Sequence, residues 1–195
     1  MKYLATVIVF FTMLFQLNVI AQDNSDDEKK DPLSAKTFTG MKFRGIGPGL
    51  ASGRVSDLAV WEPEPNYFFA AAASGGVWKT TNGGTTWQPV FDGQGSYSIG
   101  CVEIDPNNKH VVWVGTGENN SQRSVSWGDG VYKSVDGGKS WKNMGLKESE
   151  HIGKIVIDPR NSNNVYAAAQ GPLWGPGGDR GLYKTTDAGK NWERI

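Results

Sequence analysis

A twelve-residue pattern occurs three times in this chain of 195 residues. It runs glycine, aliphatic, aromatic, lysine, Ser or Thr, any residue, Asp or Asn, any residue, glycine, two more residues and tryptophan. The copies end at Trp87, Trp141 and Trp192, which are 54 and 51 residues apart. A β-rich repeat of about 50 residues is typical of propeller blades. The repeat therefore predicts an array of equivalent β units.

The centre of each copy has the composition of a β-hairpin turn. Glycine adopts positive φ there, and the Asp or Asn side chain accepts hydrogen bonds from backbone amides of its own turn. The tryptophan is expected to fold back over its hairpin. We call this pattern the Asp box and assign its carboxylates to turn stabilisation rather than to catalysis or calcium binding. The residues given this structural role are Asn82, Gly84, Trp87, Asp136, Gly138, Trp141, Asp187, Gly189 and Trp192.

Two alternating apolar runs precede each box, for example residues 102–104 and 111–114 in the second repeat. Each repeat thus offers four short antiparallel strands, A to D, with the box at the C–D hairpin, which is how a propeller blade is built. The sequence predicts an all-β fold, a β-propeller of about three four-stranded antiparallel blades within residues 37–195. The expected blades are approximately residues 52–93, 97–146 and 151–195. Because closed propellers typically have about 4 to 8 blades, we expect an incomplete ring that further C-terminal blades continue.

The first residues have the features of a secretory signal peptide. Lys2 is followed by an apolar stretch, and small or apolar residues precede Gln22. Residues 1–21 are therefore expected to be cleaved after Ala21, which makes the protein secreted or periplasmic. Residues 22–36 are polar and acidic, so we expect a disordered leader. No further apolar span follows, and no integral membrane span is expected after cleavage.

The composition restricts the kind of partner. Lysine plus arginine number 20, as do aspartate plus glutamate, so the formal net charge is zero. This balance argues against a nucleic-acid surface and leaves protein, peptide or carbohydrate ligands. Cys101 is the only cysteine, and its apolar neighbours predict a buried, unreactive thiol. No cofactor or metal is expected, since His151 has no second histidine nearby that would indicate zinc.

The three B–C connections differ in length and occupy residues 73–76, 116–129 and 170–180. Loops on a rigid scaffold usually carry function, so we expect the ligand on the face formed by the B–C and D–A loops. Tryptophans beside planar polar groups suit sugar rings or peptide segments. The candidate ligand-binding residues are Glu118, Asn119, Gln122, Arg123, Trp127, Trp174, Arg180 and Arg54.

Structural alternatives stay open for these loop residues. The tryptophans can pack between blades, and the charges can pair locally, for instance Asp179 with a neighbouring arginine. Arg54 either faces the central channel or forms a salt bridge at the end of a strand. Exposure of the aromatic rings and pairing of the charged groups distinguish these alternatives.

The boxes, together with residues 74–79 (SGGVWK) and 115–120 (GTGENN), resemble the sortilin-type Asp-box propellers, which include BNR-repeat proteins. The chain is most similar to secreted bacterial members described as glycosyl-hydrolase-like BNR repeat proteins. The resemblance covers roughly residues 38–195. In the animal members the propeller binds peptides and proteins, so the resemblance implies a ligand-binding module.

Two groups of enzymes share parts of the same pattern. Xyloglucan-active hydrolases are similar around residues 72–78 and have an aspartate near the position of Ala73, where this chain has no carboxylate. Sialidases have an early Phe-Arg-Ile-Pro motif whose arginine binds the substrate carboxylate. Residues 43–48 (FRGIGP) resemble that motif through Arg44 but contain two inserted glycines. Both departures argue against the corresponding activity.

The sequence favours an exported, non-catalytic propeller that binds protein, peptide or glycan through its B–C and D–A loop face. The alternative is a glycoside hydrolase, xyloglucanase-like or sialidase-like, whose active site is completed by later blades. A purely structural scaffold is a third hypothesis. Hydrolysis needs two carboxyl groups that face one glycosidic bond. Glu118, Asp129 and Asp179 are the only catalytic candidates, and none has an assigned partner.

Overall fold

The computed structural model of this protein describes residues 54–120 and 125–195. These residues form three four-stranded antiparallel sheets, each with its strands in chain order. Blade 1 contains β1 (Val55–Val60), β2 (Phe68–Ala72), β3 (Gly76–Thr80) and β4 (Gln88–Pro89). Blade 2 contains β5 (Ile99–Asp105), β6 (Asn108–Thr116), β7 (Val131–Ser134) and β8 (Lys142–Asn143). Blade 3 contains β9 (Ile152–Ile157), β10 (Val165–Ala169), β11 (Gly181–Thr185) and β12 (Glu193–Arg194).

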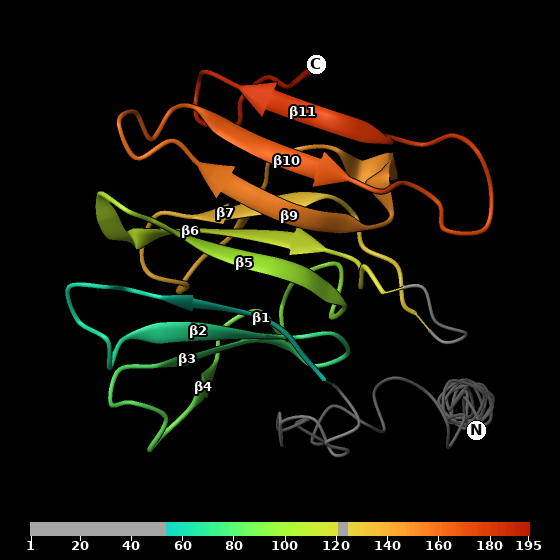
Figure 1. Ribbon diagram of the computed structural model, residues 1–195. Coiled ribbons are helices and arrows are strands. Elements are labelled where there is room, and N and C mark those ends of the chain that lie inside the picture. The colour runs from blue at the N-terminus through green and yellow to red at the C-terminus, as the bar shows by residue number, and fades with distance from the viewer. Residues whose placement is uncertain (1–53, 121–124) are drawn as a thin grey trace, which may run out of the picture. The chain divides into compact units, whose positions relative to one another are not determined.

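The three sheets are equivalent blades of a β-propeller, which confirms the predicted fold class. They lie one against the next in chain order, with blade 2 between its neighbours (Figure 1). The aromatic residue of each Asp box has the same place in the register, because Trp78 pairs with Ala70, and Tyr132 with Val114. In blade 3 the corresponding Tyr183 pairs with a small residue on β10. A short 3-10 helix at Lys147–Ser149 precedes blade 3.

Two apolar clusters fill the spaces between neighbouring sheets. One joins blades 1 and 2 and includes the fully buried Phe69 and Val112. The other joins blades 2 and 3 and includes the fully buried Trp113 and Ile155. Strand alternation places these side chains on the faces that meet, as in other packed sheets. Each contact between blades is thus a separate hydrophobic core.

The lysine and the tryptophan of the Asp box link neighbouring blades. Lys79 Nζ donates to the carbonyl of Gly137 at 2.9 Å, and Lys133 Nζ donates to the carbonyl of Ala188 at 3.3 Å. In each case the acceptor follows the box aspartate of the next blade. In the opposite direction, the indoles of Trp141 and Trp192 donate to backbone carbonyls of the preceding blade at 2.7 and 2.8 Å. Consecutive blades are therefore bonded reciprocally through their boxes.

The expected position of the tryptophan is therefore correct for one box only. Trp87 stays on its own blade, where it packs edge-on against Phe68 with ring centroids 5.3 Å apart and lies beside Gly84. Trp141 instead packs edge-on against Phe91 of blade 1. Trp192 packs edge-on against Trp113 of blade 2. Apolar surface on the preceding blade is available to the second and third boxes, and it attracts the indole away from its own hairpin.

Every blade has a β-bulge near the start of strand A. The extra residue is Ser56 in β1, Gly100 in β5 and Gly153 in β9. A Cβ at Gly100 would collide with the carbonyl oxygen of Ile152 in the next blade, so glycine permits the close approach of the two strands. Bulges redirect side chains and are common beside functional sites. The bulges of β5 and β9 lie where the D–A loops enter their sheets.

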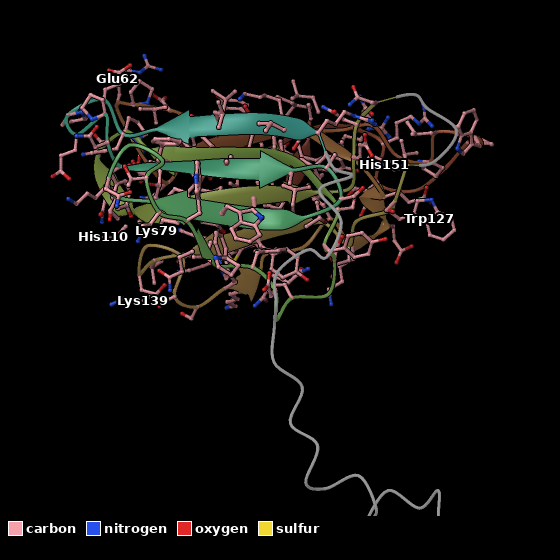
Figure 2. All side chains as sticks on the ribbon, turned by 90° about the horizontal axis from the view of Figure 1, so that it is seen from below. Glu62, Lys79, His110, Trp127, Lys139 and His151 are labelled. Carbon is pink, nitrogen blue, oxygen red and sulfur yellow. The ribbon has the colours of Figure 1, made fainter. Side chains whose placement is uncertain are left out.

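The connections between strands gather at two opposite ends of the blades (Figure 2). The Asp-box hairpins and the A–B turns form what we call the box end, where the backbone amide of Gly137 donates to the carbonyl of His110. The B–C and D–A loops form what we call the loop end, where the amide of Gly117 donates to the carbonyl of Ser98. Figure 2 shows Trp127 at the loop end, on the side opposite His110.

Several sequence-based predictions fall on residues that the structure does not describe. They concern the signal peptide at residues 1–21, the leader at 22–36, the sialidase-like Arg44, and the loop residues Gln122 and Arg123. Within the described ranges, no helix is long and apolar enough to cross a membrane.

Candidate ligand-binding face

The carboxylates of the box end are occupied by their own turns. Asp136 accepts hydrogen bonds from the Ser140 hydroxyl at 2.6 Å, from the Ser140 and Lys139 amides at 2.9 Å each, and from the Ser134 hydroxyl at 2.8 Å. These bonds, led by the one from the Ser140 side chain, lower the pKa of Asp136 well below its usual range. This carboxylate therefore stabilises a turn.

The other two boxes repeat this arrangement. Asp187 accepts bonds from the backbone amide and the side chain of Asn191, and these bonds lower the pKa of Asp187. Asn82 accepts a bond from the Thr86 amide at 2.9 Å. The hydroxyl before each turn also accepts a bond from the turn glycine, as Ser134 does from the amide of Gly138 at 2.8 Å. In all three boxes the Asp or Asn side chain and the preceding hydroxyl are thus engaged in hydrogen bonds within their own turn.

The loop end presents aromatic side chains to solvent. Tyr97, in the connection between blades 1 and 2, is 61% exposed. Trp127, in the B–C loop of blade 2, is 69% exposed, and Trp174, in the B–C loop of blade 3, is 71% exposed. The rings of these tryptophans are therefore not packed between blades.

Hydrogen bonds hold the segments around two of these aromatics together. The Tyr97 hydroxyl lies 3.1 Å from the Ser126 hydroxyl. The Ser96 hydroxyl donates to the carbonyl of Trp127 at 3.0 Å, and the Ser98 hydroxyl donates to the carbonyl of Ser126 at 2.8 Å. Tyr97 was not among the predicted binding residues, because its position in a D–A loop was the only sequence feature that indicated a binding role. These bonds fix Tyr97 and Trp127 relative to each other without covering either ring.

Glu118 is a buried member of an ion pair that joins two blades. Its side chain is 2% exposed, and its carboxylate contacts the guanidinium of Arg54 at the start of strand A of blade 1. The Glu118 amide also donates to the Ser98 hydroxyl at 2.9 Å. Of the two alternatives for Arg54, the structure thus shows a salt bridge at the end of a strand. A carboxylate that is buried and paired with an arginine is shielded from solvent, and is therefore poorly placed to meet a substrate.

The other two candidate carboxylates accept hydrogen bonds from neighbouring elements, Asp129 from β7 and Asp179 from the short 3-10 helix before blade 3. Asp129 accepts a hydrogen bond from the Tyr132 hydroxyl at 2.5 Å. Asp179 accepts one from the Glu148 amide at 3.1 Å and does not pair with Arg180, which donates instead to backbone carbonyls of its own loop. The local ion pair suggested for Asp179 is therefore absent from the described residues. Among the described residues, Glu118, Asp129 and Asp179 thus each have a different bonding partner.

A pocket of about 450 Å³ lies between the B–C loops of blades 2 and 3. It brings together two predicted binding residues, Asn119 and Arg180, while the side chain of Asn119 is anchored by its bond to the carbonyl of Gly153 at 3.1 Å. This volume is within the range of small-molecule sites. Its lining consists of Asn119, Ala169, Gln170, Pro172, Leu173, Arg180 and Gly181.

Two further polar groups near the loop end are buried. His151 is 1% exposed, and neither of its ring nitrogens has a hydrogen-bond partner among the described residues. Burial lowers the pKa of His151. Burial also raises the pKa of the Cys101 thiol to about 12, which confirms that this cysteine is buried and unreactive at neutral pH. The described residues contain no group of three or more metal-ligating side chains.

Comparison with curated proteins points to xyloglucanases, although no protein-family model matches the chain. The xyloglucanase Xgh74A of Acetivibrio thermocellus is 22% identical over 174 residues, which are 83% of this chain and 20% of that protein. A probable oligoxyloglucan-reducing end-specific xyloglucanase of Neosartorya fischeri is 30% identical over 99 residues, which are 48% of this chain and 10% of that protein. The chain thus spans between a tenth and a fifth of these relatives.

Solved structures show the same likeness. An ancestral GH74 enzyme superposes with a TM-score of 0.58 at 26% identity, over 77% of this chain and 19% of that one. The GH74 enzyme of Niastella koreensis superposes with a TM-score of 0.54 at 26% identity, over 70% of this chain and 20% of that one. These comparisons do not show the sortilin-type or BNR family that the sequence resembles. They show that this chain has a β-propeller fold similar to that of GH74 enzymes.

Proposed function

We propose that this chain supplies glycan-binding blades of a glycoside-hydrolase-type propeller, and that its loop end binds a polysaccharide of the xyloglucan class. The observation that carries the proposal is the exposure of Tyr97, Trp127 and Trp174 on one face of three consecutive blades. Flat aromatic rings suit the apolar faces of sugar rings, and polar groups beside them suit the hydroxyls. The xyloglucanase relatives favour a glycan over the peptide or protein ligand first considered.

The described blades contribute binding rather than bond cleavage to this function. A glycosidase places two carboxyl groups about 5 to 9.5 Å apart across the scissile bond. Glu118 is buried against Arg54, and Asp129 and Asp179 accept hydrogen bonds from neighbouring elements. Ala73, where the resemblance to xyloglucanases puts an aspartate, is 1% exposed and carries no carboxyl group. Hydrolysis by the whole protein is therefore expected to use carboxylates other than these three.

Calorimetric titration of the protein with xyloglucan oligosaccharides tests the proposal. Trp127→Ala and Trp174→Ala should each weaken binding by about tenfold, which is the loss of about 1.4 kcal/mol of contact. Val135→Ala is the matched control, because Val135 is a similarly exposed apolar residue at the box end. Unchanged affinity in both folded tryptophan variants would contradict a glycan site at the loop end.

Reducing-sugar release separates binding from hydrolysis. We expect the same titrated samples to show no release that depends on the candidate carboxylates. If the protein releases reducing sugar and a folded Glu118→Gln, Asp129→Asn or Asp179→Asn variant does not, bond cleavage belongs to these blades. That result would overturn the proposal that they contribute binding only. A peptide array run in parallel tests the other ligand class: strong peptide binding without glycan binding would favour a protein-recognition propeller.

A further inference from the structure

The pocket between the B–C loops of blades 2 and 3 is lined by one charged side chain, that of Arg180. We infer that it is a subsite for the carboxylate of an acidic sugar, such as a uronic acid within or attached to the bound glycan. The inference rests on the proposed function, since it concerns the same loop end. It adds that one sugar residue of the bound glycan is acidic. Neither the exposed aromatic rings nor the similarity to xyloglucanases implies an acidic sugar.

Arg180 supplies the positive charge of this pocket. It is the only ionisable residue of the lining. Its Nη2 atom donates to the carbonyl of Gly175 at 3.0 Å and to that of Pro172, which fixes the guanidinium at the pocket wall. A guanidinium has five N–H donors in a fixed fork, so further donors remain for a ligand. That fork matches the two oxygens of a carboxylate.

No acidic side chain of the described residues neutralises this arginine. The carboxylate of Asp179, its neighbour in sequence, accepts the Glu148 amide. Glu118, which precedes the pocket residue Asn119, is buried against Arg54. The two acids that come nearest in sequence to the pocket are thus committed elsewhere. An anionic group of a ligand would therefore meet an arginine that lacks a carboxylate partner within the described part of the chain.

The remaining lining suits the rest of a sugar ring. Asn119 donates its amide nitrogen to the carbonyl of Gly153, which orients its side chain at one wall. The backbone amide of Gln170 donates to the carbonyl of His151 at 2.8 Å, whereas its side-chain amide makes no hydrogen bond within residues 54–120 and 125–195. Pro172 and Leu173 provide an apolar surface. A pocket with an apolar wall, two amides and one guanidinium can receive a ring, its hydroxyls and its carboxylate together.

The test compares two sugars that differ only at the carboxyl group. The protein is titrated by calorimetry with a trisaccharide ending in glucuronic acid and with the same trisaccharide after reduction of the carboxyl group to the alcohol. We expect the acidic form to bind about tenfold more tightly, as a charge-assisted bidentate contact provides. The preference should shrink as salt is raised, because Arg180 is solvent-exposed.

Variants at the pocket make the test specific. Arg180→Gln should abolish the preference for the acid and leave the affinity for the reduced trisaccharide within about twofold, whereas Lys190→Gln, an exposed cation at the box end, should change neither. Gln170→Ala removes an amide without disturbing the bonds of Arg180, and should weaken both sugars a few-fold. Equal affinity for the two sugars, or an equal loss for both in Arg180→Gln, would overturn the inference.

The outcome is distinguishable from failure of the proposed function. Trp127→Ala reports on neutral xyloglucan binding and does not touch the pocket lining. If neutral binding depends on Trp127 while the acidic and reduced trisaccharides bind alike, the loop end binds glycan and the acidic subsite is wrong. Suppose instead that neither tryptophan variant affects binding of neutral xyloglucan, but Arg180→Gln removes the preference for the acidic sugar. The acidic subsite is then supported, and the proposed glycan site at the exposed tryptophans is wrong.

Discussion

The box end and the loop end are built on the same twelve strands but use their polar groups differently. At the box end, the backbone amides of three hairpins donate to a hydroxyl and to an Asp or Asn side chain, as they do to Ser134 and Asp136. At the loop end the B–C connections differ in length, and Trp127 and Trp174 face solvent. Groups that are satisfied within the turn stabilise the fold, whereas side chains left exposed on a rigid frame are available to a ligand.

The largest expected difference between the two ends concerns tryptophan. Trp141→Ala removes the packing against Phe91 and the bond to the Val90 carbonyl, and should lower the free energy of unfolding by about 3 kcal/mol. Trp127→Ala, at an exposed position, should change it by less than about 0.5 kcal/mol. Urea unfolding monitored by circular dichroism measures both. Equal destabilisation by the two substitutions would remove the distinction between the ends.

A smaller difference is expected for hydroxyl groups. Ser134→Ala leaves the buried Gly138 amide without its acceptor and should cost about 2 kcal/mol. Ser126→Ala removes a loop-end hydroxyl that lies 3.1 Å from the exposed Tyr97 hydroxyl, and should cost less than about 0.5 kcal/mol. The same urea titration compares them. A neutral Ser134→Ala would show that the box does not depend on its hydroxyl.

The lysines of the boxes sharpen the comparison between blades. Lys133→Met removes a bond to the Ala188 carbonyl of the next blade and should lower stability by about 1 kcal/mol. Lys184 is the equivalent residue of blade 3; it lies over the Tyr166 ring and has no such carbonyl acceptor among the described residues. Lys184→Met should therefore have about half that effect or less. Thermal unfolding of the two variants decides, and identical shifts in Tm would argue against an interblade role for Lys133.

The two ends should also respond to different ranges of pH. His151 has a pKa lowered by burial, so the unfolded chain binds the proton first, and stability should fall as pH drops below about 6.5. Asp136 and Asp187 have lowered pKa values, so their contribution is complete above about pH 4 and is lost as pH falls further. Urea midpoints measured from pH 8 to pH 3 resolve the two ranges. His151→Phe should remove the first fall and Asp136→Asn should reduce the second; a single fall below pH 4 in the unsubstituted protein would contradict the role of His151.

The sequence was sufficient to predict what depends on local pattern. Alternation of apolar residues and the turn chemistry of Asp136-Gly137-Gly138 are local, so the strands, their order and the hairpins followed from them. The position of the Trp141 indole did not, because its acceptor, the carbonyl of Val90, is 51 residues away in the sequence. Tertiary packing on the preceding blade decides that position, and no local pattern contains it.

The candidate site was predicted less completely for the same reason. The loops that carry Trp127 and Trp174 stood out by length and composition, but the burial of Glu118 against Arg54 joins two different blades. That contact pairs a candidate catalytic carboxylate with an arginine of the neighbouring blade. Gln170, which lines the pocket with Arg180, had no signal beyond its place in a loop. Exposure and pairing across blades, rather than residue type, determine which loop residues remain available.

Amide hydrogen exchange with and without a saturating xyloglucan oligosaccharide tests the central claim most directly. Both ends of the blades are observed in one experiment, and the ligand contacts need not be assigned beforehand. The account predicts slower exchange in the loop-end segments 94–98, 117–120, 125–129 and 170–181, with no change in the box hairpins 81–87, 135–141 and 186–192. Protection of the box hairpins, with the loop-end segments unaffected, would contradict it.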